Sequence, residues 1–192
     1  MNEYQKKEFS IGTLDGLSEK QIEAHLGLYA GYVKNTNKIM KLLEEMMADS
    51  EANAYQLSEV KRRFGFEFNG MRLHELYFEQ FESEEGTLKS LKDALAEQYG
   101  SYDAWEAQCR AIASMRGVGW VLLVQDERTG HLHTIWVSDH EIGHLGGQKV
   151  LLAMDVWEHA FLVDYLPNER GVYIDAFFKN LNWNVVEGRF TA

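Results

Sequence analysis

The hydrophobic pattern changes its period at Arg116-Gly117, and this change constrains the fold more than any other feature of the sequence. Upstream of it, apolar residues recur every three or four positions, which is the spacing of one helix face. Downstream, the runs GWVLLV (119–124) and HLHTIWV (131–137) are rich in β-branched and aromatic residues and flank the turn segment DERTG. The chain is therefore expected to be an α+β protein, in which an N-terminal helical hairpin precedes a C-terminal domain with a three-stranded antiparallel sheet flanked by helices.

The N-terminal half is expected to contain several separate helices. Ser18 followed by Gln21 is a capping-box pattern, and it opens a long helix that continues to about residue 48. Gly65 is expected to end the next helix, and Ser101 to cap a later one. The helices expected after the first one cover residues 54–64, 71–81, 88–99 and 105–114.

A third strand is expected at residues 150–154, after the two strands of the hairpin. The pattern then returns to helical spacing over residues 156–165 and 172–187, and the only proline, Pro167, separates these two helices. A polar segment at residues 82–87 is the expected domain boundary. We therefore expect a helical hairpin domain over residues 1–84 and a C-terminal α/β domain over residues 85–192.

Composition excludes several classes of partner. A net charge of −11 argues against nucleic-acid binding, because phosphate contacts need clustered Lys and Arg and the chain has only Lys61-Arg62-Arg63. No apolar run approaches the roughly 20 residues that cross a bilayer, and the N-terminal residues lack an apolar secretion signal. We therefore expect a cytoplasmic protein with no membrane partner. The single Cys109 excludes a thiolate metal cluster.

Four residues are candidates for metal ligands. Asp155 and His159 are four positions apart, a spacing that brings both side chains to one side of a helical turn. His25 and His74 lie on the expected inward faces of their helices. Taken singly, each histidine is more simply explained as a hydrogen-bonded core residue. Together, three imidazoles and one carboxylate suit iron, manganese or zinc.

Several segments resemble the iron/manganese superoxide dismutases, and they extend along nearly the whole chain. The central one is DVWEHA at 155–160, and the others are LSEKQIEAH at 17–25, MRLHELYF at 71–78, GVGW at 117–120 and FFKNLNW at 177–183. The resemblance implies that one iron or manganese ion per subunit is bound by His25, His74, Asp155 and His159. It also implies that superoxide is the substrate and that dioxygen and hydrogen peroxide are the products.

The resemblance also implies residues around the metal. Tyr32 corresponds to the tyrosine at the entrance to the site, although one residue fewer separates it from the first ligand histidine, so either the helix lacks an irregular turn or Tyr32 is displaced. The family's glutamine donor to the metal-bound solvent is absent, because its position holds Gly70. We expect His144 to supply this contact, ahead of Gln148 and His140. Tyr32 and His144 are thus the expected catalytic residues.

A homodimer is expected from the same resemblance. Glu158 corresponds to the residue that bridges to the partner's His159. A histidine and a tyrosine that meet across the family's dimer interface are missing, because their places hold Tyr29 or Ala30 and Leu162. This departure leaves an alternative to the active enzyme, namely a metal-binding structural relative with little or no dismutase activity.

Overall fold

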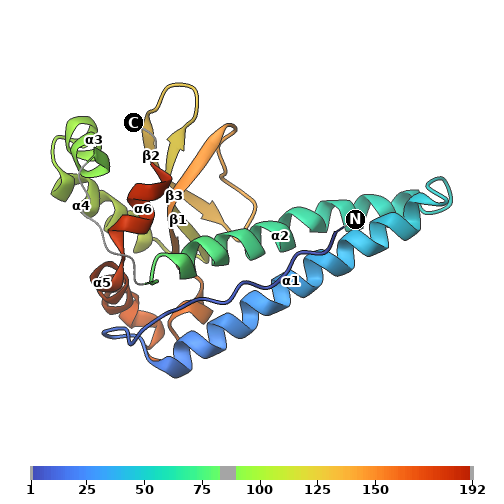
Figure 1. Ribbon diagram of the computed structural model, residues 1–192, viewed down its shortest axis with the longest axis horizontal. Helices are drawn as coiled ribbons and strands as arrows, with labels where there is room; N and C mark the ends of the chain where they lie inside the picture. Colours follow the sequence, from blue (N-terminus) through green and yellow to red (C-terminus); the bar gives the residue numbers. More distant parts are fainter. Residues whose placement is uncertain (1, 83–89, 191–192) are drawn as a thin grey trace.

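The computed structural model describes residues 2–82 and 90–190 (Figure 1). An N-terminal pair of long helices leads into a three-stranded sheet with the remaining helices around it. The predicted α+β class is therefore confirmed. The predicted division between residues 84 and 85 lies outside the described residues and stays a prediction.

Two long antiparallel helices, α1 (Glu19–Met47) and α2 (Ala54–Glu79), form the hairpin that projects from the body of the molecule (Figure 1). Ser18 caps α1 as predicted, because its side chain accepts a hydrogen bond from the Gln21 amide at 3.1 Å. The prediction that Gly65 ends a helix was wrong, since α2 is continuous from Ala54 to Glu79. A glycine inside a helix costs only about 1 kcal/mol, and α2 packs extensively against α1.

Two shorter helices follow, α3 (Ser90–Tyr99) and α4 (Tyr102–Ala113). The Ser101 side chain accepts a hydrogen bond from the Ala104 amide at 3.0 Å, which confirms it as the N-cap of α4. The buried face of α4 carries Trp105, whose indole donates to the Thr134 hydroxyl at 2.9 Å. This contact ties the helix pair to the sheet.

The strands β1 (Gly119–Asp126), β2 (Leu132–Ser138) and β3 (Gln148–Asp155) form an antiparallel sheet in the order β2-β1-β3. The central strand β1 is buried along almost its whole length, as its apolar sequence requires. Trp120 of β1 is paired with Asp155 of β3, and the Val156 amide donates to the Gly119 carbonyl at 2.9 Å. Asp155 therefore lies at the end of the β1–β3 ladder, beyond the register shift at Leu123 and Val124.

The chain after β3 differs from the prediction. Residues 156–165 do not form an α-helix but contain one 3₁₀ turn, η1 (Glu158–Ala160), because the backbone leaves helical geometry at Phe161 with φ −146°. A second 3₁₀ turn, η2 (Pro167–Glu169), precedes α5 (Arg170–Asn180). The predicted helix 172–187 is broken, because the Asn182 side chain caps a new helix, α6 (Trp183–Arg189).

Among the residues described, no helix has both the length and the apolar character needed to cross a membrane.

Candidate metal centre

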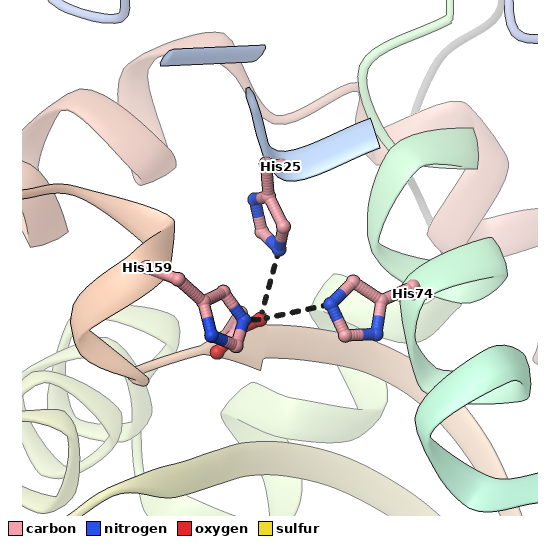
Figure 2. A group of neighbouring side chains, drawn as sticks. His25, His74 and His159 are labelled. Atoms are coloured by element: carbon pink, nitrogen blue, oxygen red, sulfur yellow. Dashed lines mark hydrogen bonds and ion pairs between the residues drawn. The ribbon is translucent and has the colours of Figure 1, made fainter. Parts of the chain in front are cut away.

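Four side chains from four different elements converge on one point, and Figure 2 shows the rings of the three histidines pointing toward it. His25 comes from α1, His74 from α2, Asp155 from the end of β3 and His159 from η1. One ligand atom from each of these residues lies within 4.8 Å of the other three. The structure therefore brings together all four of the residues that the sequence analysis singled out.

The donor atoms point at one another. Asp155 Oδ2 is 3.0 Å from His25 Nε2, 3.1 Å from His159 Nε2 and 3.6 Å from His74 Nε2. His74 Nε2 is fully buried and has no hydrogen-bond partner in the part of the chain that the structure describes. A polar atom buried without a partner is costly, and a metal ion at this point would remove that cost. Imidazole and carboxylate donors in this number suit iron or manganese.

Contacts outside the cluster fix the orientation of its members. His74 Nδ1 lies 2.6 Å from the Gly70 carbonyl, so Nδ1 carries the proton and the Nε2 lone pair faces the cluster. The Trp157 amide donates to Asp155 Oδ1 at 2.8 Å, which leaves Oδ2 for the histidines. The Tyr173 hydroxyl donates to the Asp155 carbonyl at 2.6 Å and holds the end of β3 in place.

Burial prepares the protonation states that a metal requires. Desolvation lowers the pKa of His25 and lowers that of His74 well below its ordinary value, so both imidazoles are neutral. Desolvation alone would raise the pKa of Asp155, but the charge of His159 and hydrogen bonds from His159 and His25 hold that pKa far below its usual range. The carboxylate is therefore ionised, as a ligand must be.

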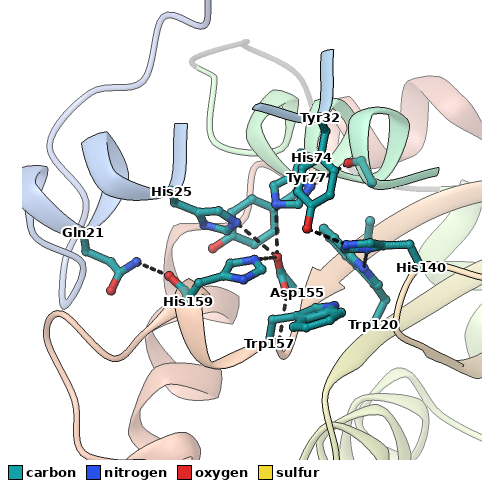
Figure 3. Close-up of polar contacts among 12 residues, drawn as sticks. Gln21, His25, Tyr32, His74, Tyr77, Trp120, His140, Asp155, Trp157 and His159 are labelled. Carbon is teal, nitrogen blue, oxygen red and sulfur yellow. Dashed lines mark hydrogen bonds and ion pairs between the residues drawn. The ribbon is translucent and has the colours of Figure 1, made fainter. Parts of the chain in front are cut away.

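Tyr32 and His140 form a hydrogen-bonded pair beside the cluster (Figure 3). The Tyr32 ring lies 5.0 Å from the His74 ring between centroids, and its hydroxyl is 2.8 Å from His140 Nε2. The helix α1 has no irregular turn between His25 and Tyr32, and seven residues along a regular helix return to nearly the same face, about 20° short of two turns. Tyr32 thus shares a face with His25.

The tautomer of His140 follows from its other neighbour. The Trp120 indole nitrogen can only donate, and it donates to His140 Nδ1 at 2.9 Å. Burial lowers the pKa of His140 to about 4, so the ring is neutral and its single proton is on Nε2. His140 therefore donates to the Tyr32 oxygen. The hydroxyl proton of Tyr32 is left free to be donated elsewhere.

His144, the expected solvent contact, makes different interactions. Its Nε2 donates to the His140 carbonyl at 3.1 Å, and its Nδ1 accepts from the Gln148 side chain at 2.8 Å. The structure brings His140, and not His144, into contact with Tyr32. One signal in the sequence points to the contact of His140: the buried indole of Trp120 needs an acceptor, which His140 supplies. The role of His144 at the metal-bound solvent stays a prediction.

The positions that depart from the resemblance are occupied as follows. Tyr29 is buried, and its hydroxyl accepts from the Lys7 amide at 2.9 Å and donates to Glu75 at 3.1 Å. Leu162 is 40% exposed, and Glu158 is exposed as well. Tyr29 therefore faces the N-terminal segment and α2, where it makes both of these bonds.

Comparisons with known proteins agree with this geometry. Residues 87–189 match the family described as iron/manganese superoxide dismutases, C-terminal domain. The protein named superoxide dismutase (Fe) of Aquifex pyrophilus is 38% identical over 92% of this chain and 85% of its own length. The one of Cupriavidus metallidurans is 38% identical over 93% and 91%. Superoxide dismutase (Mn) 1 of Halobacterium salinarum is 35% identical over 84% and 80%. The chain belongs to the iron/manganese superoxide dismutase family.

Proposed function

We propose that this protein is a superoxide dismutase, which converts superoxide to dioxygen and hydrogen peroxide at one iron or manganese ion. The ion is held by His25, His74, Asp155 and His159. One observation carries the proposal: four donor atoms from four elements lie within 4.8 Å of one another at a buried point. Relatives named for iron and for manganese are similar to the chain, so both metals belong to the proposal.

Bound iron or manganese supplies a one-electron couple between the divalent and trivalent states. The chain supplies a rigid and largely dry environment, since His25, His74 and Asp155 are fully buried and the His159 side chain is only 20% exposed. Fixed donors need little reorganisation when charge changes at the site.

Proton delivery is the second task of the protein, because the reduction of superoxide to hydrogen peroxide consumes protons. Tyr32 holds a proton that His140 does not accept, since His140 Nε2 is itself the donor to the Tyr32 oxygen. Desolvation raises the pKa of Tyr32, so the hydroxyl stays protonated. We assign the proton to Tyr32 and the task of orienting it to His140, in place of His144.

The quaternary structure is also part of the proposal. A homodimer would place Glu158 against the partner's His159, and the exposed position of Glu158 beside η1 is compatible with such a bridge. Sedimentation analysis of the wild type and of Glu158→Gln tests it, because loss of the bridge should shift the population toward monomer. The cytoplasmic location expected from the sequence stays a prediction that cell fractionation checks.

The function is tested with protein reconstituted separately with iron and with manganese. Bound metal is quantified, and superoxide decay is followed by fast spectroscopy. Rapid decay with one metal identifies the enzyme and its metal, and comparable decay with both identifies an enzyme that uses either one. Full metal content with no decay would refute the dismutase and leave the metal-binding relative, which the changed positions Tyr29 and Leu162 favour.

A further inference from the structure

A buried glutamine connects the first ligand helix to the last ligand. Gln21 is fully buried and lies one helical turn before His25 on α1. Its Nε2 donates to the His159 carbonyl at 2.7 Å (Figure 3). Its Oε1 accepts from the Val163 amide at 3.0 Å. One side chain thus binds two backbone groups of the segment that carries His159.

The segment around His159 has few other long-range supports for its backbone. Asp155 is held by the β1–β3 ladder, and His25 and His74 belong to long helices. His159 instead lies in the 3₁₀ turn η1, whose backbone hydrogen bonds stay within the segment, such as Ala160 to Trp157 at 3.0 Å. Its side chain is 20% exposed, whereas those of the other three ligands are fully buried. The position of its imidazole therefore depends on individual side-chain contacts.

The cap of α1 explains why Gln21 is available for this role. In a full capping box, the side chain at this position would return to the backbone amide of Ser18. Here Asp164 accepts from that amide at 2.7 Å and from the Ser18 hydroxyl at 2.6 Å. Asp164 belongs to the same segment as His159. The segment therefore supplies the acceptor for the Ser18 amide, and Gln21 is left to bind the backbone of the segment. Two side chains, Asp164 and Gln21, join them.

We propose that Gln21 is a positioning residue, which holds the backbone of His159 so that its imidazole stays at the metal. The inference rests on the proposed function in requiring that the cluster binds a metal. Partners that orient metal ligands commonly change metal affinity by about 10–100-fold when they are removed. Gln21 acts on the ligand that lacks a regular element, so removing it should chiefly accelerate the release of metal.

The test compares Gln21→Met with a matched variant, Gln80→Met. Gln80 is also fully buried, and it binds the Ala153 carbonyl at 2.8 Å and the Ala153 amide at 2.7 Å. Its target belongs to β3, which the ladder to β1 holds independently. Both variants lose a pair of hydrogen bonds to one backbone segment, and Gln80→Met also loses longer contacts to the Tyr77 carbonyl at 3.5 Å and from Arg189 at 3.4 Å. Only Gln21→Met loosens a ligand on an irregular segment. The manganese-loaded proteins are mixed with excess EDTA, and release is followed alongside thermal unfolding.

We expect Gln21→Met to release manganese about 10-fold faster than the wild type and Gln80→Met to release it at the wild-type rate, although both unfold at lower temperature. The visible spectrum of the cobalt-substituted protein should change in Gln21→Met alone. Equal release from both variants, or wild-type release from Gln21→Met, would overturn the inference. If Gln21→Met does not fold, Gln21→Glu decides in the same way, since it keeps the acceptor for Val163 and removes the donor. A wild type that binds no metal would instead refute the proposed function.

Discussion

The ligands of the candidate metal centre are supported in two different ways. His25, His74 and Asp155 lie on helices and on a strand whose regular hydrogen bonds fix the backbone. His159 lies in the single 3₁₀ turn η1 and the neighbouring His140 in a loop, so neither belongs to an α-helix or a β-strand. The first group is positioned by the fold as a whole. The second group depends on single side chains.

Each connecting segment is anchored by a side-chain amide of a long helix, which binds one of its backbone carbonyls. The carbonyl of His159 accepts from the side-chain amide of Gln21 on α1 at 2.7 Å, and the carbonyl of His140 accepts from the side-chain amide of Asn69 on α2 at 2.8 Å. Each long helix therefore presents a ligand histidine and also anchors one irregular segment. The positions of the ligand histidines and of both irregular segments therefore depend on the hairpin. Substitutions at the two kinds of support should consequently have effects of different kinds.

The largest effect is expected from a ligand on a regular element. Asp155→Ala removes the carboxylate that all three histidines face, so metal content should fall from about one ion per chain to background, and superoxide consumption should disappear with it. Elemental analysis and fast spectroscopy measure the two quantities. Asp126→Ala is the matched control, because that carboxylate binds the Arg128 amide and the Thr129 hydroxyl in the β1–β2 turn, away from the cluster. Full metal content in Asp155→Ala would contradict the assignment.

The next effect concerns the connecting segment 139–147. His140→Ala removes the group that orients Tyr32, and turnover should fall roughly 100-fold, as expected for the loss of organised proton transfer. Metal content should be retained. His144→Ala should leave turnover unchanged, because the hydrogen bonds of its imidazole run to the His140 carbonyl and the Gln148 side chain rather than to Tyr32. Measuring kcat and bound metal for both variants separates the two histidines, and the opposite ranking would restore His144 as the catalytic residue.

The same two kinds of support explain what the sequence could predict. The long helix α1, its Ser18 cap and the antiparallel strands follow from periodicity and local hydrogen bonding, which the sequence displays directly. The segment HEIGH (140–144) contains two histidines four positions apart. Periodicity cannot predict which of them faces the site, because an irregular segment has no fixed rotation and rise per residue. Long-range contacts from Trp120 and Asn69 hold His140 where it meets Tyr32.

The helix expected over residues 156–165 failed for a related reason. The spacing of its apolar residues is helical, but the segment must turn directly out of the β1–β3 ladder at Val156, and the backbone departs again at Phe161. The sequence pattern around Gln21 indicates only a helix cap with Ser18. Its bridge to His159 spans 138 positions of the chain, and no local pattern announces such a contact.

A pH titration of the metal-free protein sharpens the comparison further. The pKa of His140 is lowered from 6.5 to about 4 by burial, so the unfolded chain binds a proton that the folded chain does not bind between these values. Stability is therefore full above pH 6.5 and falls as the pH decreases toward 4, by up to about 3 kcal/mol from this group. His140→Gln should lose less stability over that window in urea unfolding experiments. Parallel curves for the two proteins would refute the assignment.

The smallest effects are expected inside a regular element, where two glycines of α2 differ in their surroundings. A Cβ at Gly70 would lie 2.6 Å from Tyr32 Cδ1, so Gly70→Ala should move the Tyr32 ring and cost about 1–3 kcal/mol of unfolding free energy. A Cβ at Gly65 would meet only the end of the exposed Glu141 side chain, at 3.1 Å. Gly65→Ala should therefore stabilise the protein by about 0.5–1 kcal/mol.

Urea unfolding of both glycine variants measures these changes, and turnover with full metal content shows whether Tyr32 has moved. Only Gly70→Ala should lower turnover, because its Cβ would contact the ring that His140 orients. If Gly65→Ala lowered turnover equally, the distal part of α2 would also control the site. The whole length of the hairpin, and not only the turns nearest the metal, would then determine the position of the ligands. If the two variants differ as expected, only the turns of α2 nearest the metal determine the positions of His140 and Tyr32.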